Sequence, residues 1–325
     1  MRPLEYARPE TLEQASELLA DGGTPLAGGT DLLALLKDDA VTASRLVDLK
    51  GLPGLEDFSA GPEGFRIGAL ARLADLAREK ALVDRLPALA SSFDSVGGPQ
   101  IRNRGTLGGN LLQRPRCWYF RRGFGLVPVR DGRSMVREGD NRFHAVFGTD
   151  GEALFVTPST VVPLLVALGA EAEIHGREGV RRAPVAELYR SPDPGERELH
   201  LEPGEILTAV EIPDASDRTV ASYEVRPGES LDWSLATASV VLRRSGATVR
   251  ESRIVLGQVA PTPWRSRAAE EALAGGSLSP DRVRAAAQAA VAEAEPLSMN
   301  EYKVQLARVA VERALHRAAG REVPS

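Results

Sequence analysis

The stretch TLGGNLLQRPRCWYFRR, residues 106–122, sets a paired-glycine turn directly before a basic segment that holds the only cysteine of the chain. A second paired glycine lies in PLAGGTDLL, residues 25–33. Glycine lets backbone N–H groups approach a ligand closely and allows positive φ angles. Consecutive N–H groups in such a turn form an anion-binding nest, and a helix that follows adds a favourable dipole. Together the two turns predict a diphosphate that is held from both sides.

Two glycine turns do not by themselves identify a nucleotide. A paired glycine can also serve as a plain turn without a ligand. Neither turn matches the G-x-G-x-x-G dinucleotide motif or the Walker A loop. The residues alone therefore leave a diphosphate site and two structural turns as alternatives.

The composition predicts a protein with a large core. The chain has 325 residues, of which 43% are hydrophobic, enough for two or three domains. A formal net charge of −5 argues against a general nucleic-acid or membrane-surface binder. A single cysteine excludes an internal disulfide framework and any metal site made of several thiolates of this chain. The sequence shows neither a signal peptide nor the roughly 20 apolar residues of a spanning helix, so we expect a cytoplasmic protein without membrane insertion.

The first half of the chain predicts a small α/β lobe followed by helices. A capping box at Thr11 and Gln14 predicts a helix that DGG, residues 21–23, terminates. Strands are expected in TPLAGG, RLVDL and GFRIGAL, with a short helix in DLLALLK and helical patterns over residues 73–92. Residues 96–151 are rich in glycine and arginine and lack periodicity, so we expect them to be either functional or poorly ordered.

The second half predicts short strands and closing helices. Strands are expected in EAEIHG, RRAPVAEL and ILTAVEIP, and residues 211–218 are the predicted domain boundary. Residues 237–257 alternate in polarity and predict a hairpin. Two helices are expected at the end, one capped by Ser279 and the other beginning at Ser298, where Glu301 completes a capping box.

At the glycine turns the sequence becomes similar to a known family. PLAGGTDLL, VGGPQIRNRGTLGGN and VAPTPWRSRAAEEAL resemble the FAD-binding medium subunits of the xanthine dehydrogenase and carbon monoxide dehydrogenase family of molybdenum hydroxylases. NLLQRPRCWYF, GDNRFHAVFG and NEYKVQLARVAVERAL further resemble the branch that contains aldehyde oxidoreductase FAD subunits and 4-hydroxybenzoyl-CoA reductase β subunits. The likeness covers nearly the whole chain, with the motifs in the expected order.

This resemblance implies an α+β fold. A two-lobed FAD-binding domain of the PCMH type would span residues 1–215, with lobe 1 at about 1–55, lobe 2 at about 56–215 and an insertion at about 114–150. A C-terminal three-stranded sheet with packed helices would follow in residues 216–325.

The resemblance also implies which residues contact FAD. The first glycine stretch would wrap the diphosphate and ribityl region, and the second would complete the grip. Two apolar residues fall where relatives contact the flavin, and a Ser-Thr pair falls near the ribityl chain. The implied FAD-binding residues are Leu26, Ala27, Gly28, Gly29, Thr30, Asp31, Leu32, Leu33, Val96, Thr106, Gly108, Gly109, Asn110, Ser159, Thr160 and Leu207. No catalytic residue and no metal ligand is implied, since the flavin carries the chemistry.

Three departures from the family pattern matter. Related subunits of the aldehyde oxidoreductase branch carry several cysteines in the stretch after RCWYF, residues 116–120, and these cysteines hold a [4Fe–4S] cluster. In this chain only Cys117 is present. One thiolate cannot hold such a cluster, so we predict that the insertion is retained and the cluster is absent. Thr160 stands where relatives often have an aspartate. Glu224 stands where many relatives place a lysine near the flavin, and a carboxylate there would disfavour the anionic reduced flavin.

The basic segment after the second glycine turn could have several other roles. Its arginines could steer an anion or dock an acidic partner, or form a solvated loop with ion pairs. The aromatic residues between them could mimic a single-stranded nucleic-acid surface, but the acidic net charge argues against it and favours a protein interface. Cys117 is expected to be a small buried residue or a redox thiol, and His144 a flavin contact or a structural histidine. The arginines are Arg114, Arg116, Arg121 and Arg122 of this segment, together with Arg102 and Arg104 just before the second glycine turn.

The sequence therefore predicts an electron-transfer flavoprotein subunit. Its FAD would take electrons from an iron–sulfur ([2Fe–2S]) subunit, fed by a molybdopterin-binding large subunit, and pass them to NAD⁺, a quinone or O₂. One alternative is a non-catalytic subunit that bridges its partners and has a decayed flavin site. Another is a stand-alone flavin oxidase, for which the chain offers no active-site base.

Overall fold

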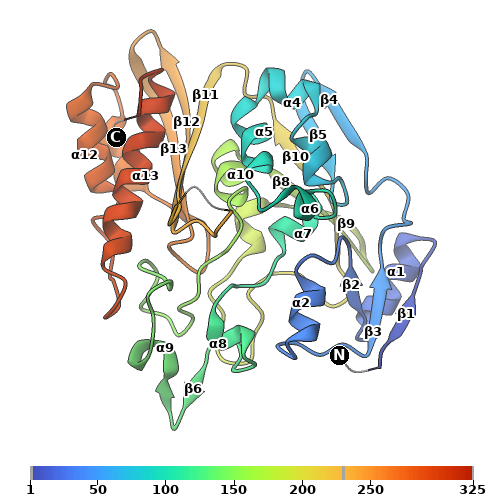
Figure 1. The fold of residues 1–325 in the computed structure, drawn as a ribbon. Helices are drawn as coiled ribbons and strands as arrows, with labels where there is room; N and C mark the ends of the chain where they lie inside the picture. The colour runs from blue at the N-terminus through green and yellow to red at the C-terminus, as the bar shows by residue number, and fades with distance from the viewer. Residues whose placement is uncertain (1–2, 229–230, 324–325) are drawn as a thin grey trace.

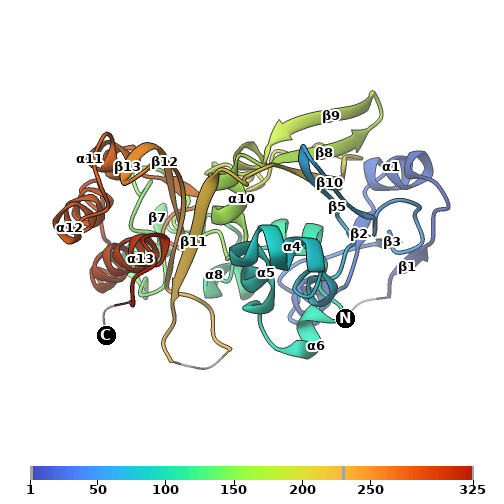
Figure 2. The same cartoon turned by 90° about the horizontal axis from the view of Figure 1, so that it is seen from above.

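Three large β-sheets stand side by side in the computed structural model, which describes residues 3–228 and 231–323 (Figure 1). Seen from above, the sheet nearest the C-terminus lies at one end, a five-stranded sheet lies in the middle and the N-terminal sheet lies at the other end (Figure 2). Sheets and helices are mixed along the chain, which confirms the predicted α+β class.

The N-terminal lobe contains a three-stranded parallel sheet with strand order β1-β3-β2. The Thr11 hydroxyl accepts a hydrogen bond from the Gln14 amide at 3.2 Å, which caps the first helix as predicted. The Gln14 side chain accepts from the Glu10 amide and so does not close the box on Thr11. The elements are β1 (Glu5–Ala7), α1 (Leu12–Ala20), β2 (Thr24–Leu26), α2 (Leu32–Lys37) and β3 (Arg45–Asp48).

The central sheet is antiparallel, with strand order β4-β5-β10-β8-β9. Its strands are β4 (Phe58–Gly61), β5 (Gly64–Gly68), β8 (Glu171–Gly176), β9 (Gly179–Pro184) and β10 (Ile206–Pro213), with the 3-10 helix η1 (Val185–Leu188) after β9. The helical patterns over residues 73–92 form α3 (Leu73–Leu76), α4 (Lys80–Arg85) and α5 (Pro87–Asp94). Leu82, Leu89 and Phe93 of these helices are fully buried in the same core as the sheet.

A short buried helix joins the central sheet to the C-terminal sheet. All residues of α10 (Val162–Leu168) are apolar and all except Val166 are buried. The helix ends at Gly169, whose φ of +78° favours glycine. Its side chains share one core with Ile67 of β5 and with Val255 of the C-terminal sheet. The two sheets are therefore held together by continuous apolar packing.

The C-terminal sheet contains the three predicted antiparallel strands and the predicted hairpin. These strands are β11 (Arg218–Val225), β12 (Ala236–Ser245) and β13 (Thr248–Gly257). A fourth strand of two residues, β14 (Trp264–Arg265), pairs with β13 and has no counterpart in the sequence prediction. The helices beside the sheet are α11 (Arg267–Leu273), which the sequence did not predict, α12 (Pro280–Ala289) and α13 (Tyr302–Ala318) (Figure 2).

The two closing helices differ in how well their starts were predicted. The Ser279 hydroxyl accepts from the Arg282 amide at 3.3 Å and caps α12. The predicted start of the last helix at Ser298 is wrong, since α13 begins at Tyr302. The Ser298 hydroxyl accepts a hydrogen bond from the Asn141 side chain at 3.0 Å, so a contact distant in sequence replaces the cap.

The stretch of residues 96–151 is built from short regular elements. Its second half, from α8 to α9, lies at the lower edge of the molecule in Figure 1. The elements are α6 (Pro99–Arg102), α7 (Leu107–Leu111), α8 (Trp118–Arg121), β6 (Val129–Arg130), β7 (Arg133–Ser134) and α9 (Met135–Glu138). Within residues 3–228 and 231–323, no helix combines the length and the apolar character needed to cross a bilayer.

Candidate functional site

The first glycine turn packs directly against the chain just before the second one. A Cβ atom at Gly28 would lie 1.8 Å from the carbonyl oxygen of Arg104 and 3.2 Å from the amide nitrogen of Gly105. Gly29 has a φ of +74°, which residues with a side chain rarely adopt. The two glycine stretches therefore lie side by side, as the sequence predicts.

The first turn leaves a row of amide groups without partners. Within the described residues, the N–H groups of residues 28–32 make no hydrogen bond. The next amide, that of Leu33, donates to the Gly29 carbonyl at 3.1 Å and begins the helical pattern. Consecutive free amides in a turn form a concavity that binds anions such as phosphate. These free amides are what the predicted nest requires, and their contact with a phosphate stays a prediction.

The second glycine turn offers no free row of amides, so the nest predicted there is wrong. The Gly108 amide donates to the Ala69 carbonyl at 2.7 Å, and the Gly109 amide donates to the Thr106 hydroxyl at 3.1 Å. A Cβ atom at Gly108 would lie 2.9 Å from the Ala69 Cβ, so glycine is needed here for close packing of α7. This turn can offer a ligand its bare main chain and the side chains of Thr106 and Asn110.

The Asp31 carboxylate ties the first turn to the basic segment. It accepts hydrogen bonds from the Arg114 amide at 2.9 Å, from the Arg116 guanidinium at 2.5 Å and from the Arg121 guanidinium at 2.8 Å. Burial alone would raise the pKa of Asp31, but the two guanidinium charges and these hydrogen bonds lower it below its usual value. The side chain is thus engaged within the chain, and the backbone amide of Asp31 is what remains for a ligand.

A narrow cavity is lined by predicted contacts from three separate stretches of sequence. Val96, Asn110 and Thr160 all line it. The opposite part of the wall comes from the described part of the β11–β12 loop, including Trp233. Glu229 and Ser230 of that loop lie outside the described residues. The fold therefore brings together three predicted flavin contacts that the sequence keeps far apart.

Glu224 is held by residues of the same cavity and its charge is paired. Its Oε2 accepts from the Arg226 guanidinium at 2.8 Å and from the Ser234 hydroxyl at 2.7 Å, and its Oε1 accepts from the Ser95 hydroxyl at 2.6 Å. Ser95, Arg226 and Ser234 line the cavity. The Glu224 carboxylate therefore faces a cation of its own chain and links the end of α5 to β11 and to the β11–β12 loop.

Some of the predicted FAD-contact residues are buried inside the protein. Leu207 is 5% exposed and belongs to the core around the central sheet, so it presents little surface to a ligand. Leu26 is buried against Leu46 in lobe 1. Ser159 is fully buried and donates to Asn110 Oδ1 at 2.6 Å, which orients the Asn110 side chain.

The remaining predicted residues of the first stretch lie at the turn itself. The Ala27 carbonyl accepts from the Lys50 ammonium at 3.2 Å. Thr30 is exposed, and Leu32 and Leu33 form the first turn of α2, with Leu33 37% exposed.

Cys117 and His144 form a close pair, and neither lines the cavity. Cys117 Sγ lies 3.1 Å from His144 Nε2. Burial raises the pKa of the Cys117 thiol, and burial together with the charge of Lys303 lowers the pKa of His144 to about 4. Near neutral pH both groups are uncharged, which does not suit a reactive thiolate. In the described parts of the chain no group of three or more His, Cys, Asp and Glu side chains could hold a metal ion, and the absence of a cluster stays a prediction.

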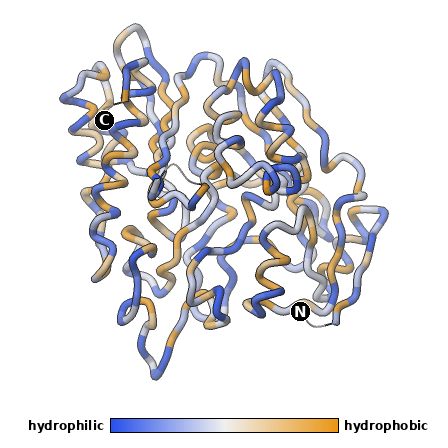
Figure 3. Tube along the Cα trace, in the orientation of Figure 1, coloured by the Kyte–Doolittle hydropathy of each residue, from blue (hydrophilic) through white to orange (hydrophobic). Residues whose placement is uncertain are grey.

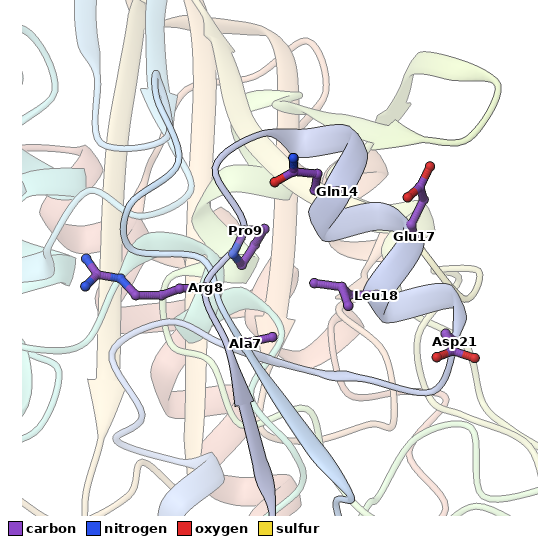
Figure 4. Close-up of a pocket in the computed structure, with 7 residues that line it drawn as sticks. All are labelled: Ala7, Arg8, Pro9, Gln14, Glu17, Leu18 and Asp21. Carbon is purple, nitrogen blue, oxygen red and sulfur yellow. The ribbon is translucent and has the colours of Figure 1, made fainter.

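A larger hollow lies on lobe 1, between the end of β1 and one side of α1 (Figure 4). Arg8 extends away from α1 in this view, and no predicted FAD contact lines the hollow. We therefore place the candidate site at the cavity that the second glycine stretch and the β11–β12 loop line, together with the free amides of the first turn. The hollow is lined by Ala7, Arg8, Pro9, Gln14, Glu17, Leu18 and Asp21.

Family models match almost the whole chain. Residues 2–215 match the FAD binding domain in molybdopterin dehydrogenase, and residues 221–318 match the CO dehydrogenase flavoprotein C-terminal domain. The chain belongs to this family of FAD-binding subunits. It is an oxidoreductase subunit of the xanthine dehydrogenase family of molybdenum hydroxylases, which confirms the resemblance that its motifs indicate.

Individual relatives are similar over their full length. The chain is 32% identical to the aldehyde oxidoreductase FAD-binding subunit PaoB of Escherichia coli K12, over 95% of this chain and 96% of the relative. It is 29% identical to the carbon monoxide dehydrogenase medium chain of Hydrogenophaga pseudoflava, over 98% and 97%. The fold matches a chain of reconstituted CO dehydrogenase from Oligotropha carboxidovorans with a TM-score of 0.78, at 26% identity and 99% coverage of both chains.

Several residues of this FAD-binding subunit's site were not singled out from the sequence. Lys50, Ser95 and Ser234 belong to no motif. The partner of Ser95, Glu224, lies far away along the chain, whereas those of Lys50 and Ser234 lie within 25 residues but beyond any local pattern. Arg116 belongs to the basic run that the sequence flagged, but nothing in the run distinguishes it from its neighbours. Trp233 could have been noticed as one of only three tryptophans, in a loop beside Glu224.

Proposed function

We propose that this FAD-binding subunit transfers electrons from an iron–sulfur subunit to an external acceptor within a molybdopterin-dependent dehydrogenase complex. The observation that carries the proposal is the row of free amides at residues 28–32, which Arg116 joins to the wall of a cavity lined by predicted flavin contacts. FAD, when bound, supplies the electron-accepting chemistry.

The chain's own residues would bind and orient the cofactor. The amides of residues 28–32 suit the diphosphate, because each donates to a negatively charged oxygen without a side chain in the way. The cavity wall combines Val96, an apolar contact, with the polar side chains of Asn110 and Thr160. Thr106, Gly108 and Gly109 would form the second side of the grip through main-chain packing and the Thr106 hydroxyl.

The proposed partners are a [2Fe–2S] subunit and a molybdopterin-binding large subunit. Relatives that support this are named as an aldehyde oxidoreductase FAD-binding subunit and as carbon monoxide dehydrogenase medium chains. The acceptor would be NAD⁺, a quinone or O₂. A non-catalytic bridging role is disfavoured, because a decayed site has no need of an open row of amides next to a lined cavity.

Purification of the native complex through a tag on this chain tests the proposal. We expect two partner chains to be recovered, with molybdenum, iron and visible flavin absorbance. We also expect the flavin to stay with this chain and the iron to leave with the partners when the subunits are separated. Recovery of the chain alone, colourless even after added FAD, would overturn the electron-transfer role and favour the bridging subunit.

A further inference from the structure

Arg116 occupies the junction between the first glycine turn and the cavity. Its guanidinium reaches Asp31 at 2.5 Å and donates to the Gln113 side chain at 2.7 Å. It also lies over the Trp233 ring, with 4.1 Å between the guanidinium carbon and the ring centroid. Gln113 and Trp233 both line the cavity. The Arg116 side chain thus contacts both the first glycine turn and the cavity wall.

The charges around Asp31 do not balance. Asp31 carries one negative charge and contacts two guanidinium groups, those of Arg116 and Arg121. The guanidinium of the neighbouring Arg114 pairs with Glu198. Among the residues that the structure describes, the two guanidinium groups at Asp31 therefore exceed its carboxylate by one positive charge, beside the free amides of residues 28–32. The extended segment that delivers these arginines is hydrophilic in Figure 3.

Arg116 also has an unused donor. Its Nε is buried and finds no hydrogen-bond acceptor among the described residues. A buried donor without an acceptor destabilises the fold, and so it points to a missing acceptor. The arginine guanidinium suits phosphate oxygens in particular, because it presents a planar fork of N–H donors and stays positively charged. Burial lowers the pKa of Arg116 to about 10, which leaves it protonated near neutral pH.

We propose that Arg116 is an additional binding residue for the FAD diphosphate, supplied by the insertion that here holds a single cysteine. Its side chain and the free amides of residues 28–32 would share the phosphate charge, and its contact with Trp233 would couple the filled diphosphate site to the cavity wall. This inference rests on the proposed function, since it assumes that FAD is the ligand.

Flavin titrations of the full-length chain, stripped of flavin, test this role. FAD carries the diphosphate and riboflavin does not, so the two ligands separate phosphate binding from ring binding. We expect Arg116→Gln to raise the Kd for FAD about tenfold, as the loss of one charge-assisted hydrogen bond implies, and to change the Kd for riboflavin less than twofold. Arg122→Gln is the matched control, because Arg122 is exposed in the same insertion and should leave both values unchanged.

A second variant covers the case in which Arg116→Gln does not fold. Arg116→Lys keeps the positive charge but loses the planar fork of donors. We therefore expect a smaller loss of FAD affinity than in Arg116→Gln and no loss of riboflavin affinity. An equal loss of affinity for FAD and for riboflavin would show that Arg116 has a purely structural role and would overturn the inference. Arg116 variants that bind FAD as tightly as Arg122→Gln would overturn it as well. A wild-type chain that binds no FAD would overturn the proposed function itself, which distinguishes the two failures.

Discussion

Replacement of Gly28 by alanine is expected to weaken FAD binding by roughly a factor of 100, which corresponds to two hydrogen bonds to a charged group at roughly 1.5 kcal/mol each. The physical reason is a backbone clash. The new Cβ would lie 1.8 Å from the Arg104 carbonyl oxygen, and no rotamer change can relieve a contact between Cβ and main chain. The turn must therefore move away from the Arg104–Gly105 segment, and the amides of residues 28–32 move with it.

Flavin titration of the purified variant measures this effect. Gly61→Ala is the matched control, because a Cβ at Gly61 meets nothing within 4 Å and its binding should equal that of the wild type. Circular dichroism of both variants checks that the fold is retained. Wild-type affinity in Gly28→Ala would contradict the claim that this close approach shapes the diphosphate site.

Replacement of Lys303 by methionine is expected to destabilise the chain by about 3 kcal/mol, the scale for leaving buried hydrogen-bond partners unsatisfied. Lys303 is 1% exposed. Its ammonium donates to the carbonyls of Gln258 at 2.7 Å, His144 at 3.0 Å and Phe143 at 3.4 Å. Methionine nearly preserves the length of the side chain but donates nothing, so these contacts of α13 with residues 143–144 and with the end of β13 are lost.

Urea unfolding measures the loss of stability. Lys80→Met is the control: it makes the same replacement of side chain, but Lys80 is 85% exposed and water can take the place of its pair with Asp84. Similar unfolding midpoints for the two variants would contradict the structural role of Lys303. Burial is the main cause of the low pKa of His144 and the charge of Lys303 is the second, so that pKa is expected to rise only in part in Lys303→Met.

The parts of the fold that the sequence predicted are those with local signals. The capping residues Thr11 and Ser279 act within three residues, and the hairpin at residues 237–257 shows its alternation directly. Gly28 could be singled out because bare backbone is a property of the residue itself. The start at Ser298 failed because Asn141, distant in sequence, takes its hydroxyl.

In the candidate site, too, the features with a local sequence signal were predicted and those without one were not. The nest at residues 28–32 was predictable from the glycines, whereas the second nest failed because the Gly108 amide finds a carbonyl, that of Ala69, that no local pattern reveals. The pairing of Glu224 with Ser95 and the contact of Arg116 with Trp233 each join segments more than 100 residues apart. Such contacts follow from tertiary packing, so a single sequence does not predict them.

Backbone hydrogen exchange at the first glycine turn tests the central claim most directly. The account predicts that saturating FAD slows exchange of the amides of residues 28–32 at least about tenfold, because each gains an acceptor, while the amides of Gly108 and Gly109, already bonded within the chain, change less. Unchanged exchange at residues 28–32 in a chain that visibly holds its flavin would contradict the account.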